Sequence, residues 1–235
     1  MSATKIQRRE FSDGAALAPA FAQWTANLLQ KGVDERGEAV LIVSGGNTPK
    51  RYFAALAQRP IDWARVTITL ADERCVADDS PRSNARLLRE NLLRDHASAA
   101  RFAPLADSRL SPDQELAAAR ARIADLPLPA DLVVLGMGDD GHTASWFPKA
   151  DRLAEAIDPG GRSLVLPIVA PAAPEPRLTL TARVILRASA VALQIEGKAK
   201  QAVLDKALGD GPIEDMPIRA ALRGAAAKLT IFYAD

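Results

Sequence analysis

The chain has 235 residues, of which 48% are hydrophobic and 25% are charged, and its formal net charge is +1. This near-neutral charge, without long blocks of one sign, argues against nucleic acid or a membrane as a partner. The single cysteine excludes an intramolecular disulfide, and the two histidines exclude a zinc site with three histidine ligands. We expect no metal ion, although a Mg²⁺ site made only of carboxylates stays compatible with this composition.

The length and composition predict a single domain over residues 1–235. The first ten residues, MSATKIQRRE, lack the apolar run of a signal peptide, and no later stretch reaches the length of a transmembrane helix. The lone Cys75 fits a reducing compartment. We therefore expect a cytoplasmic protein.

Helices and short apolar strands alternate along the chain. Apolar residues recur at helical spacing from Leu17 to Leu28 and predict a first helix that ends before Gly32. This alternation predicts an α/β fold with three layers, a mostly parallel sheet with helices on both faces. Strands are expected at 39–43, 66–70, 131–136, 162–169, 191–195 and 228–233, and helices at 49–58, 81–93, 111–126 and 197–208.

Unusual polar loops follow three of the expected strands. SGGNTP (44–49) follows the first strand, ADER (71–74) the second, and GMGDDGH (136–142) the third. In open sheets of this kind, ligands bind outside the carboxyl ends of the strands. The three loops are therefore predicted to build one shared site.

The first loop has the composition of a phosphate site. Ser44, Gly45, Gly46, Asn47 and Thr48 connect a strand to a helix start, where backbone N–H groups, hydroxyls and the helix dipole favour an anion. The loop lacks the GK[ST] ending of a P-loop and is not GxGxxG. An ordinary capped turn is the alternative interpretation.

Two cations elsewhere are further candidates for a phosphate. Lys198 follows Gly197 where a strand meets a helix, and a lysine there is unfavourable for the helix unless an anion binds beside it. Arg177 lies at a loop–strand junction and could bind a phosphate through two parallel hydrogen bonds. A solvated lysine and a surface ion pair are the alternatives.

The second loop offers carboxylates beside an arginine. Asp72 could orient a hydroxylated ligand and Arg74 could stabilise a developing negative charge, unless they simply form an ion-paired loop. Cys75 could pair only with His96 or His142, and we interpret it as a packing residue.

The third loop carries the strongest signal for catalysis. His142 can act as a general base near neutral pH, and Asp139 or Asp140 can fix the tautomer of its ring. Ser145 lies nearby, but no GxSxG nucleophile elbow surrounds it. His142 is therefore predicted to activate a water molecule.

Five motifs, in order, resemble the superfamily of glucosamine-6-phosphate isomerases and 6-phosphogluconolactonases. SGGNTP resembles its SGG[ST]TP phosphate loop, ADERCV with the later Ser83–Asn84 resembles its DER-V…SN segment, and LGMGDDGHTASWFP is similar to LGMG-DGHTAS-FP. RLTLT and GKAK resemble its later arginine and Gly–Lys elements. Asn47 replaces the usual serine of the phosphate loop, and Ala77 a frequent proline. The resemblance implies a Rossmann-like fold of the NagB/RpiA/CoA-transferase type.

Within this superfamily the sequence is more similar to the lactonase branch. The deaminases carry DGHIAFNEP, whereas this chain has DGHTASWFP without a glutamate after His142. The resemblance thus implies hydrolysis of 6-phospho-D-glucono-1,5-lactone, with no metal or organic cofactor. It implies that His142 activates water, that Asp140 orients the imidazole and that Arg74 stabilises the oxyanion. The phosphate is then expected on the 44–48 loop, Arg177 and Lys198.

Two other functions stay open at this point. One is a deaminase or isomerase of the same fold, in which Asp72 would be the proton-transferring base. The other is a non-catalytic sugar-phosphate sensor, for which the sequence offers no basic helix-turn-helix segment. We expect a small phosphorylated sugar as the partner, and a monomer or small homo-oligomer.

Overall fold

The strands at the centre of the molecule are short apolar runs. In the computed structural model, which describes residues 6–235, β2 (Ala39–Val43), β3 (Val66–Leu70) and β6 (Leu132–Leu135) are buried along their whole length. Such continuous apolar runs suit a parallel sheet that is covered on both faces. Residues 1–5, the first half of the segment expected to lack a signal peptide, lie outside the described residues.

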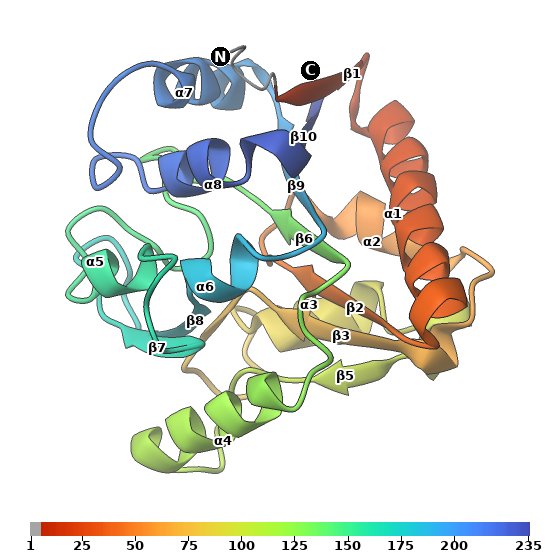
Figure 1. Ribbon diagram of the computed structural model, residues 1–235, viewed down its shortest axis with the longest axis horizontal. Helices are drawn as coiled ribbons and strands as arrows, with labels where there is room; N and C mark the ends of the chain where they lie inside the picture. The colour runs from red at the N-terminus through yellow and green to blue at the C-terminus, as the bar shows by residue number, and fades with distance from the viewer. Residues whose placement is uncertain (1–5) are drawn as a thin grey trace.

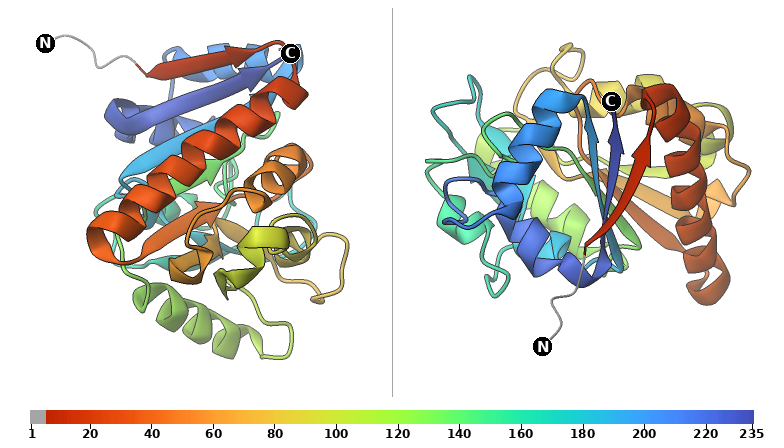
Figure 2. Two further views of the ribbon diagram at one scale, coloured as in Figure 1. Left: turned by 90° about the vertical axis from the view of Figure 1, so that its right-hand side faces the viewer. Right: turned by 90° about the horizontal axis from the view of Figure 1, so that it is seen from above.

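Seven parallel strands form the main sheet in the order β1-β10-β9-β6-β2-β3-β5. Helices α1 and α2 lie on one face, and α7 and α8 lie on the other (Figures 1 and 2). This arrangement confirms the predicted α/β class. The other strands are β1 (Gln7–Phe11), β5 (Arg101–Ala103), β9 (Ala190–Glu196) and β10 (Leu229–Ala234), and the four helices are α1 (Gly14–Arg36), α2 (Lys50–Ala57), α7 (Lys198–Leu208) and α8 (Ile218–Gly224).

A second, antiparallel sheet of three strands lies beside the main one, in the order β4-β8-β7. It consists of β4 (Asp72–Arg74), β8 (Arg177–Leu180) and β7 (Val165–Ile168). The strand expected at 162–169 is thus present, but it belongs to this sheet, and residues 72–74 form a strand instead of the expected loop. Pro167 cannot donate a backbone hydrogen bond, which suits the edge position of β7.

The first helix continues past its predicted end. Gly32 lies inside α1, where its Cα packs so closely on Asp131 that a Cβ would meet Oδ1 at 2.4 Å. The helix instead ends at Gly37, which adopts the left-handed conformation with φ of 80°. The close contact with Asp131 therefore explains Gly32, which does not mark the end of the helix.

Several elements were missing from the expectations or start elsewhere. β1 has the sequence QRREF and four exposed residues, so it lacks the apolar pattern of the other strands. The third helix begins at Asn84 rather than near Pro81, because the Ser83 side chain caps it by accepting from the Arg86 N–H. The remaining elements are α3 (Asn84–Asn91), α4 (Pro112–Ala124), α5 (Leu153–Ala156), α6 (Ala182–Ile185) and three short 3₁₀ turns (63–65, 95–99 and 226–228).

Aromatic rings join the outer helices to the sheet. The Phe21 ring on α1 stacks on Tyr52 of α2 and on Phe232 of β10, with centroid distances of 4.1 Å in both cases. Thr25 supplies the hydrogen-bond partner of the buried Tyr52 hydroxyl, at 3.0 Å.

No helix within residues 6–235 has the length and apolar character needed to cross a membrane.

Replacing Phe21 tests whether this contact holds the two helices on the sheet. We expect Phe21→Ala to lower the free energy of unfolding by about 3–5 kcal/mol, since the surrounding rings cannot close the cavity. Phe11→Ala is the control, because the half-buried Phe11 ring lies on the edge strand. Urea unfolding of both variants measures the effect, and equal losses would contradict it.

Candidate active site

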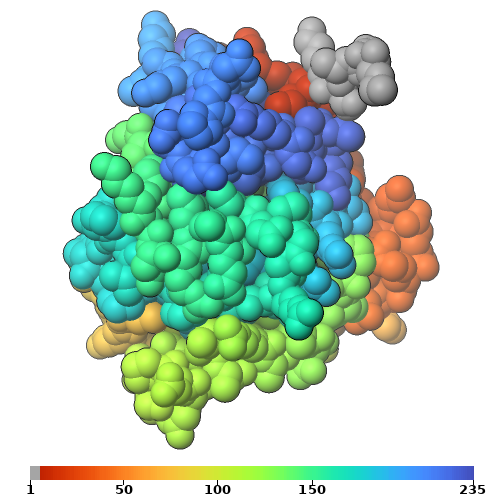
Figure 3. Space-filling view, turned by 60° about the vertical axis from the view of Figure 1, so that its left-hand side comes forward, coloured from red at the N-terminus to blue at the C-terminus, as the bar shows by residue number. Residues whose placement is uncertain are grey.

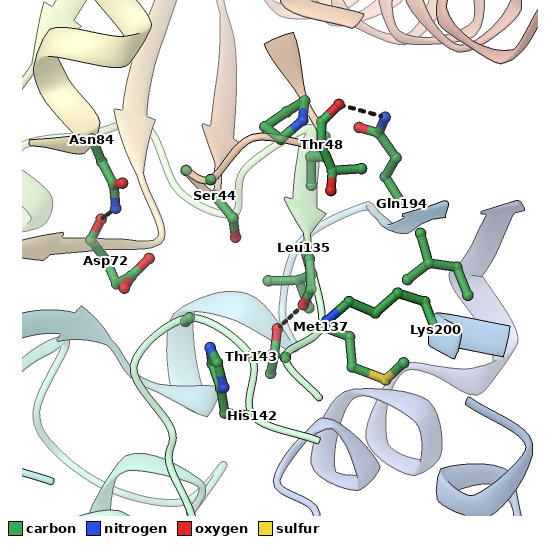
Figure 4. Close-up of a pocket in the computed structure, with 18 of the residues that line it drawn as sticks. Ser44, Thr48, Asp72, Asn84, Leu135, Met137, His142, Thr143, Gln194 and Lys200 are labelled. Atoms are coloured by element: carbon green, nitrogen blue, oxygen red, sulfur yellow. Dashed lines mark hydrogen bonds between the residues drawn. The ribbon is translucent and has the colours of Figure 1, made fainter. Parts of the chain in front are cut away.

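The site lies where the chain changes direction across the main sheet. β2 lies between β3, which follows it along the chain, and β6, from which the chain continues to the other half of the sheet. A crevice at the carboxyl ends of the strands is expected at such a point. A cavity of about 190 Å³ occupies it (Figure 4), and its polar lining consists of Ser44, Thr48, Asp72, Arg74, Asn84, His142, Thr143, Arg177, Gln194 and Lys200.

Most of the residues predicted from the sequence meet at this cavity. Asp140 does not line the cavity but contacts His142, which does. The predicted residues that line the cavity are Ser44, Gly45, Gly46, Thr48, Asp72, Arg74, His142 and Arg177. Asn47 and Lys198 are exposed and do not line it. In place of Lys198, the cavity is lined by Lys200, one helical half-turn further along α7.

The imidazole of His142 is held in one orientation. Its Nδ1 lies 2.5 Å from Asp140 Oδ1, and the same oxygen accepts the backbone N–H of His142 at 3.0 Å. Partial burial acts to raise the pKa of Asp140, but these hydrogen bonds outweigh it and lower the pKa below its usual value. Gly138 makes the arrangement possible, because a Cβ there would lie 2.0 Å from the ring nitrogen.

An aromatic ring supports the imidazole from the protein side. Phe147, itself 3% exposed, stacks on His142 with a centroid distance of 4.1 Å. The guanidinium of Arg177 lies over the same ring, with its Cζ 5.0 Å from the centroid. One buried side chain thus contacts both the candidate base and a candidate substrate-binding cation.

The loop that carries His142 is also attached to the C-terminal part of the chain. Ile218 donates its backbone N–H to Gly141 O at 2.9 Å, and Met216 packs against the Gly141 Cα. In Figure 3 the blue C-terminal segments lie directly against the green segments that follow β6. This contact holds the loop in place at Gly141, next to His142.

Asp72 and Arg177 form a buried polar pair in the cavity wall. Arg177 Nη1 lies 3.6 Å from Asp72 Oδ2, which also accepts the Ser145 hydroxyl at 2.6 Å. Burial lowers the pKa of Arg177, and the nearby Asp72 carboxylate opposes this effect. Ser145 therefore orients a carboxylate. This agrees with the absence of a GxSxG nucleophile elbow around it.

Glu73 organises the segment that follows β4. The residue is 2% exposed, and its carboxylate accepts backbone N–H groups from Arg74, Asn84 and Ala85 at 2.6–2.8 Å. Burial raises the pKa of Glu73, while these N–H groups partly offset the increase. Glu73 thus positions Asn84, whose side chain donates to Asp72 O at 2.9 Å and packs on Gly45.

Cations outnumber carboxylates among the residues that line the cavity. Three cations line it, Arg74, Arg177 and Lys200, against one carboxylate, that of Asp72. Figure 4 shows the Lys200 side chain reaching into the cavity, and its Nζ also pairs with the exposed Asp139 at 2.6 Å. This balance favours an anionic ligand, and within residues 6–235 no three His, Cys, Asp or Glu side chains gather as a metal site would require.

Three features of the cavity were not predicted from the sequence, namely Gln194, Lys200 and the role of Asn84. Asn84 stands in the quoted Ser83–Asn84 motif, so a signal for it existed. Gln194 interrupts the apolar run VALQI, and a polar residue in a buried strand is itself a signal. For Lys200 the sequence offered no means of choice between two neighbouring lysines.

Comparison with known proteins places this geometry in a family. The family described as glucosamine-6-phosphate isomerases/6-phosphogluconolactonase matches residues 12–231. The chain belongs to this family. A relative from Mesorhizobium japonicum, named 6-phosphogluconolactonase, is 49% identical over 95% of this chain and 93% of its own length. A Pseudomonas aeruginosa protein of the same name is 43% identical over 95% and 92%.

Solved structures of the family share the fold. A 6-phosphogluconolactonase from Shewanella baltica superimposes with a TM-score of 0.94, at 38% identity and 98% coverage of both chains. A monomeric glucosamine-6-phosphate deaminase, at 20% identity, has a TM-score of 0.77 and covers 97% of both chains, so it shares the fold alone. The resemblance predicted from the motifs is therefore confirmed at the level of the family.

The single cysteine lies close to the site but does not line the cavity. Burial, with the nearby Glu115 carboxylate, raises the pKa of the Cys75 thiol to about 12. At pH 8 only about one thiol in ten thousand is then ionised, and the thiolate is the reactive form.

We therefore expect Cys75 to react slowly with a thiol reagent at pH 8 in the folded protein. The same protein in concentrated urea is the control, because unfolding restores an ordinary thiol pKa. Absorbance of the released chromophore follows both reactions. Rapid labelling of the folded protein would contradict the expectation.

Proposed function

We propose that this protein hydrolyses 6-phospho-D-glucono-1,5-lactone to 6-phospho-D-gluconate, a step of the oxidative pentose phosphate pathway. The observation that carries the proposal is the His142–Asp140 pair at the mouth of a cavity lined by three cations. The names of the relatives support the same substrate, since the curated proteins at 43–49% identity are called 6-phosphogluconolactonase.

His142 is proposed to act as the general base. Because Asp140 occupies Nδ1, the ring carries its proton there and Nε2 is free to accept a proton from water. The water oxygen then bonds to the lactone C1, and Asp140 stabilises the imidazolium that forms. The imidazolium returns the proton to the departing ring oxygen, which yields a carboxylic acid and a hydroxyl group. General-base catalysis of this type contributes about 10²–10⁴-fold.

Arg74 is proposed to stabilise the oxyanion of the tetrahedral intermediate. Its Nη1 is held by the Arg82 carbonyl, while its buried Nε has no hydrogen-bond partner within residues 6–235. A buried N–H without an acceptor favours a negative charge beside it. Asp72 presents a carboxylate in the same wall, suited to a sugar hydroxyl.

The phosphate is proposed to bind at the loop after β2. The buried Ser44 hydroxyl has no partner within residues 6–235, Gly46 adopts a φ of 100°, and Thr48 leads into α2. We assign the neighbouring cation to Lys200 instead of Lys198, with Arg177 as a second one. The exposed Asn47 would contribute only its backbone N–H.

A coupled assay tests the reaction directly. Glucose-6-phosphate dehydrogenase generates the lactone, and the second dehydrogenation, of 6-phosphogluconate, reports its hydrolysis. We expect the protein to accelerate hydrolysis well above the spontaneous rate. Release of ammonia from glucosamine 6-phosphate would instead indicate the deaminase, and ligand binding without either reaction would indicate a sensor.

The two histidines provide a matched pair of variants. His142→Ala is expected to lower kcat by about 100-fold or more with little change in KM, because it removes the base but not the phosphate contacts. His96→Ala is expected to keep the activity, since His96 is exposed in a 3₁₀ turn outside the cavity. Equal kcat values for the two variants would remove His142 from the mechanism.

The two lysines of α7 separate two assignments of the phosphate contact. Lys200→Ala is expected to raise KM at least tenfold, because charge-assisted hydrogen bonds contribute about 1.5–3 kcal/mol. Lys198→Ala is expected to leave KM nearly unchanged, since Lys198 is exposed. Initial rates over a range of lactone concentrations give both values. The reverse pattern would return the phosphate contact to Lys198.

A further inference from the structure

One polar residue of the cavity has no part in the proposed reaction. Gln194 lies in β9 among apolar neighbours and is 3% exposed, yet its side chain lines the cavity beside Thr48 (Figure 4). A buried amide costs free energy unless both its donor and its acceptor are satisfied. The partners of this amide therefore indicate what the cavity is built to bind.

The orientation of the Gln194 amide is fixed by two oxygen atoms. Nε2 donates to Glu196 Oε1 at 3.2 Å and to the Thr48 carbonyl at 3.4 Å. Both partners can only accept, and Arg51 pairs with Glu196 at 3.7 Å. A rotated amide would bring its own oxygen against these two oxygens, so this orientation is strongly favoured.

The carbonyl oxygen is consequently the part of the amide that no protein group satisfies. Gln194 Oε1 is buried and accepts no hydrogen bond from any residue of the described chain, 6–235. Lys200, the cation on the same side, is engaged with Asp139 at 2.6 Å. A buried acceptor of this kind matches a ligand O–H or N–H, and it repels a phosphate oxygen.

We propose that Gln194 determines specificity by accepting a hydrogen bond from the C4 hydroxyl of the bound sugar phosphate. This assignment rests on the proposed function, because it takes the phosphate to lie on the loop that contains Thr48. Gln194 contacts that loop, so it faces the phosphate end of the sugar ring. At that end the ring oxygen is an acceptor, and the hydroxyl nearest to the phosphate-bearing C6 is the one on C4.

The wild-type protein tests the proposal through the substrate. Lactones prepared from glucose 6-phosphate and from its 2-, 3- and 4-deoxy analogues are compared by kcat/KM. Loss of the C4 hydroxyl leaves Gln194 Oε1 without a donor, and we expect a decrease of about tenfold or more. An unchanged kcat/KM for the 4-deoxy lactone would overturn the proposal.

Variants then connect the hydroxyl to this side chain. Gln194→Leu is expected to lower kcat/KM about tenfold on the parent lactone and to have little further effect on the 4-deoxy lactone, as coupled partners require. Gln201→Leu is the control, because Gln201 lies on α7 outside the cavity lining. If Gln194→Leu lowers kcat/KM equally for every analogue, the assignment is refuted. It is also refuted if the effect of this variant is lost only with the 2- or 3-deoxy lactone.

Binding of the product separates this proposal from the proposed function. Calorimetry with 6-phosphogluconate and its 4-deoxy analogue needs no turnover. If wild type discriminates between them about tenfold and Gln194→Leu does not, the assignment stands even when lactone hydrolysis is absent. If neither protein discriminates, it fails even when hydrolysis is fast. Should Gln194→Leu not fold, the discrimination by wild type alone decides.

Discussion

Backbone hydrogen bonds at the carboxyl ends of three strands fix the positions from which the loops of the site begin. Ser44 N–H donates to Val134 O at 2.9 Å and thereby connects the ends of β2 and β6. Ala71 N–H donates to Val43 O, and Leu180 N–H donates to Ala71 O, both at 2.8 Å, which connects β3 and the second sheet to the same edge. Because these bonds join buried backbone, the 44–48 loop, the Asp72 segment and the histidine loop all start from fixed positions at one edge of the sheet.

The functional side chains of the site are each held by a fixed partner in the protein. Arg177 on β8 is placed by Asp72 on β4, and His142 is placed by Asp140 and by the Phe147 ring. Their orientations therefore exist before a ligand arrives. Catalysis benefits from such preorganisation, since little reorganisation is left for the reaction itself.

The parts of the fold that the sequence predicted are those with a strong local signal. The buried strands around Val43 and Val134 are continuous apolar runs, and the histidine loop contains glycine at the positions that its geometry needs. The second sheet could not be predicted in this way. Its strand β4 has three residues, and it exists only because Asp72 and Arg74 pair with Thr179 and Arg177, a contact distant along the chain.

The choice between two lysines shows where sequence reasoning ends. Lys198 and Lys200 both open α7, and residues two apart on a helix point roughly 200° away from each other. Only one of them can face the cavity, and which one depends on how α7 is rotated about its axis. That rotation is set by packing, since Leu204 and Ala207 of α7 are buried. Motif similarity located the helix start, but the packing of these apolar residues decided which of the two lysines lines the cavity.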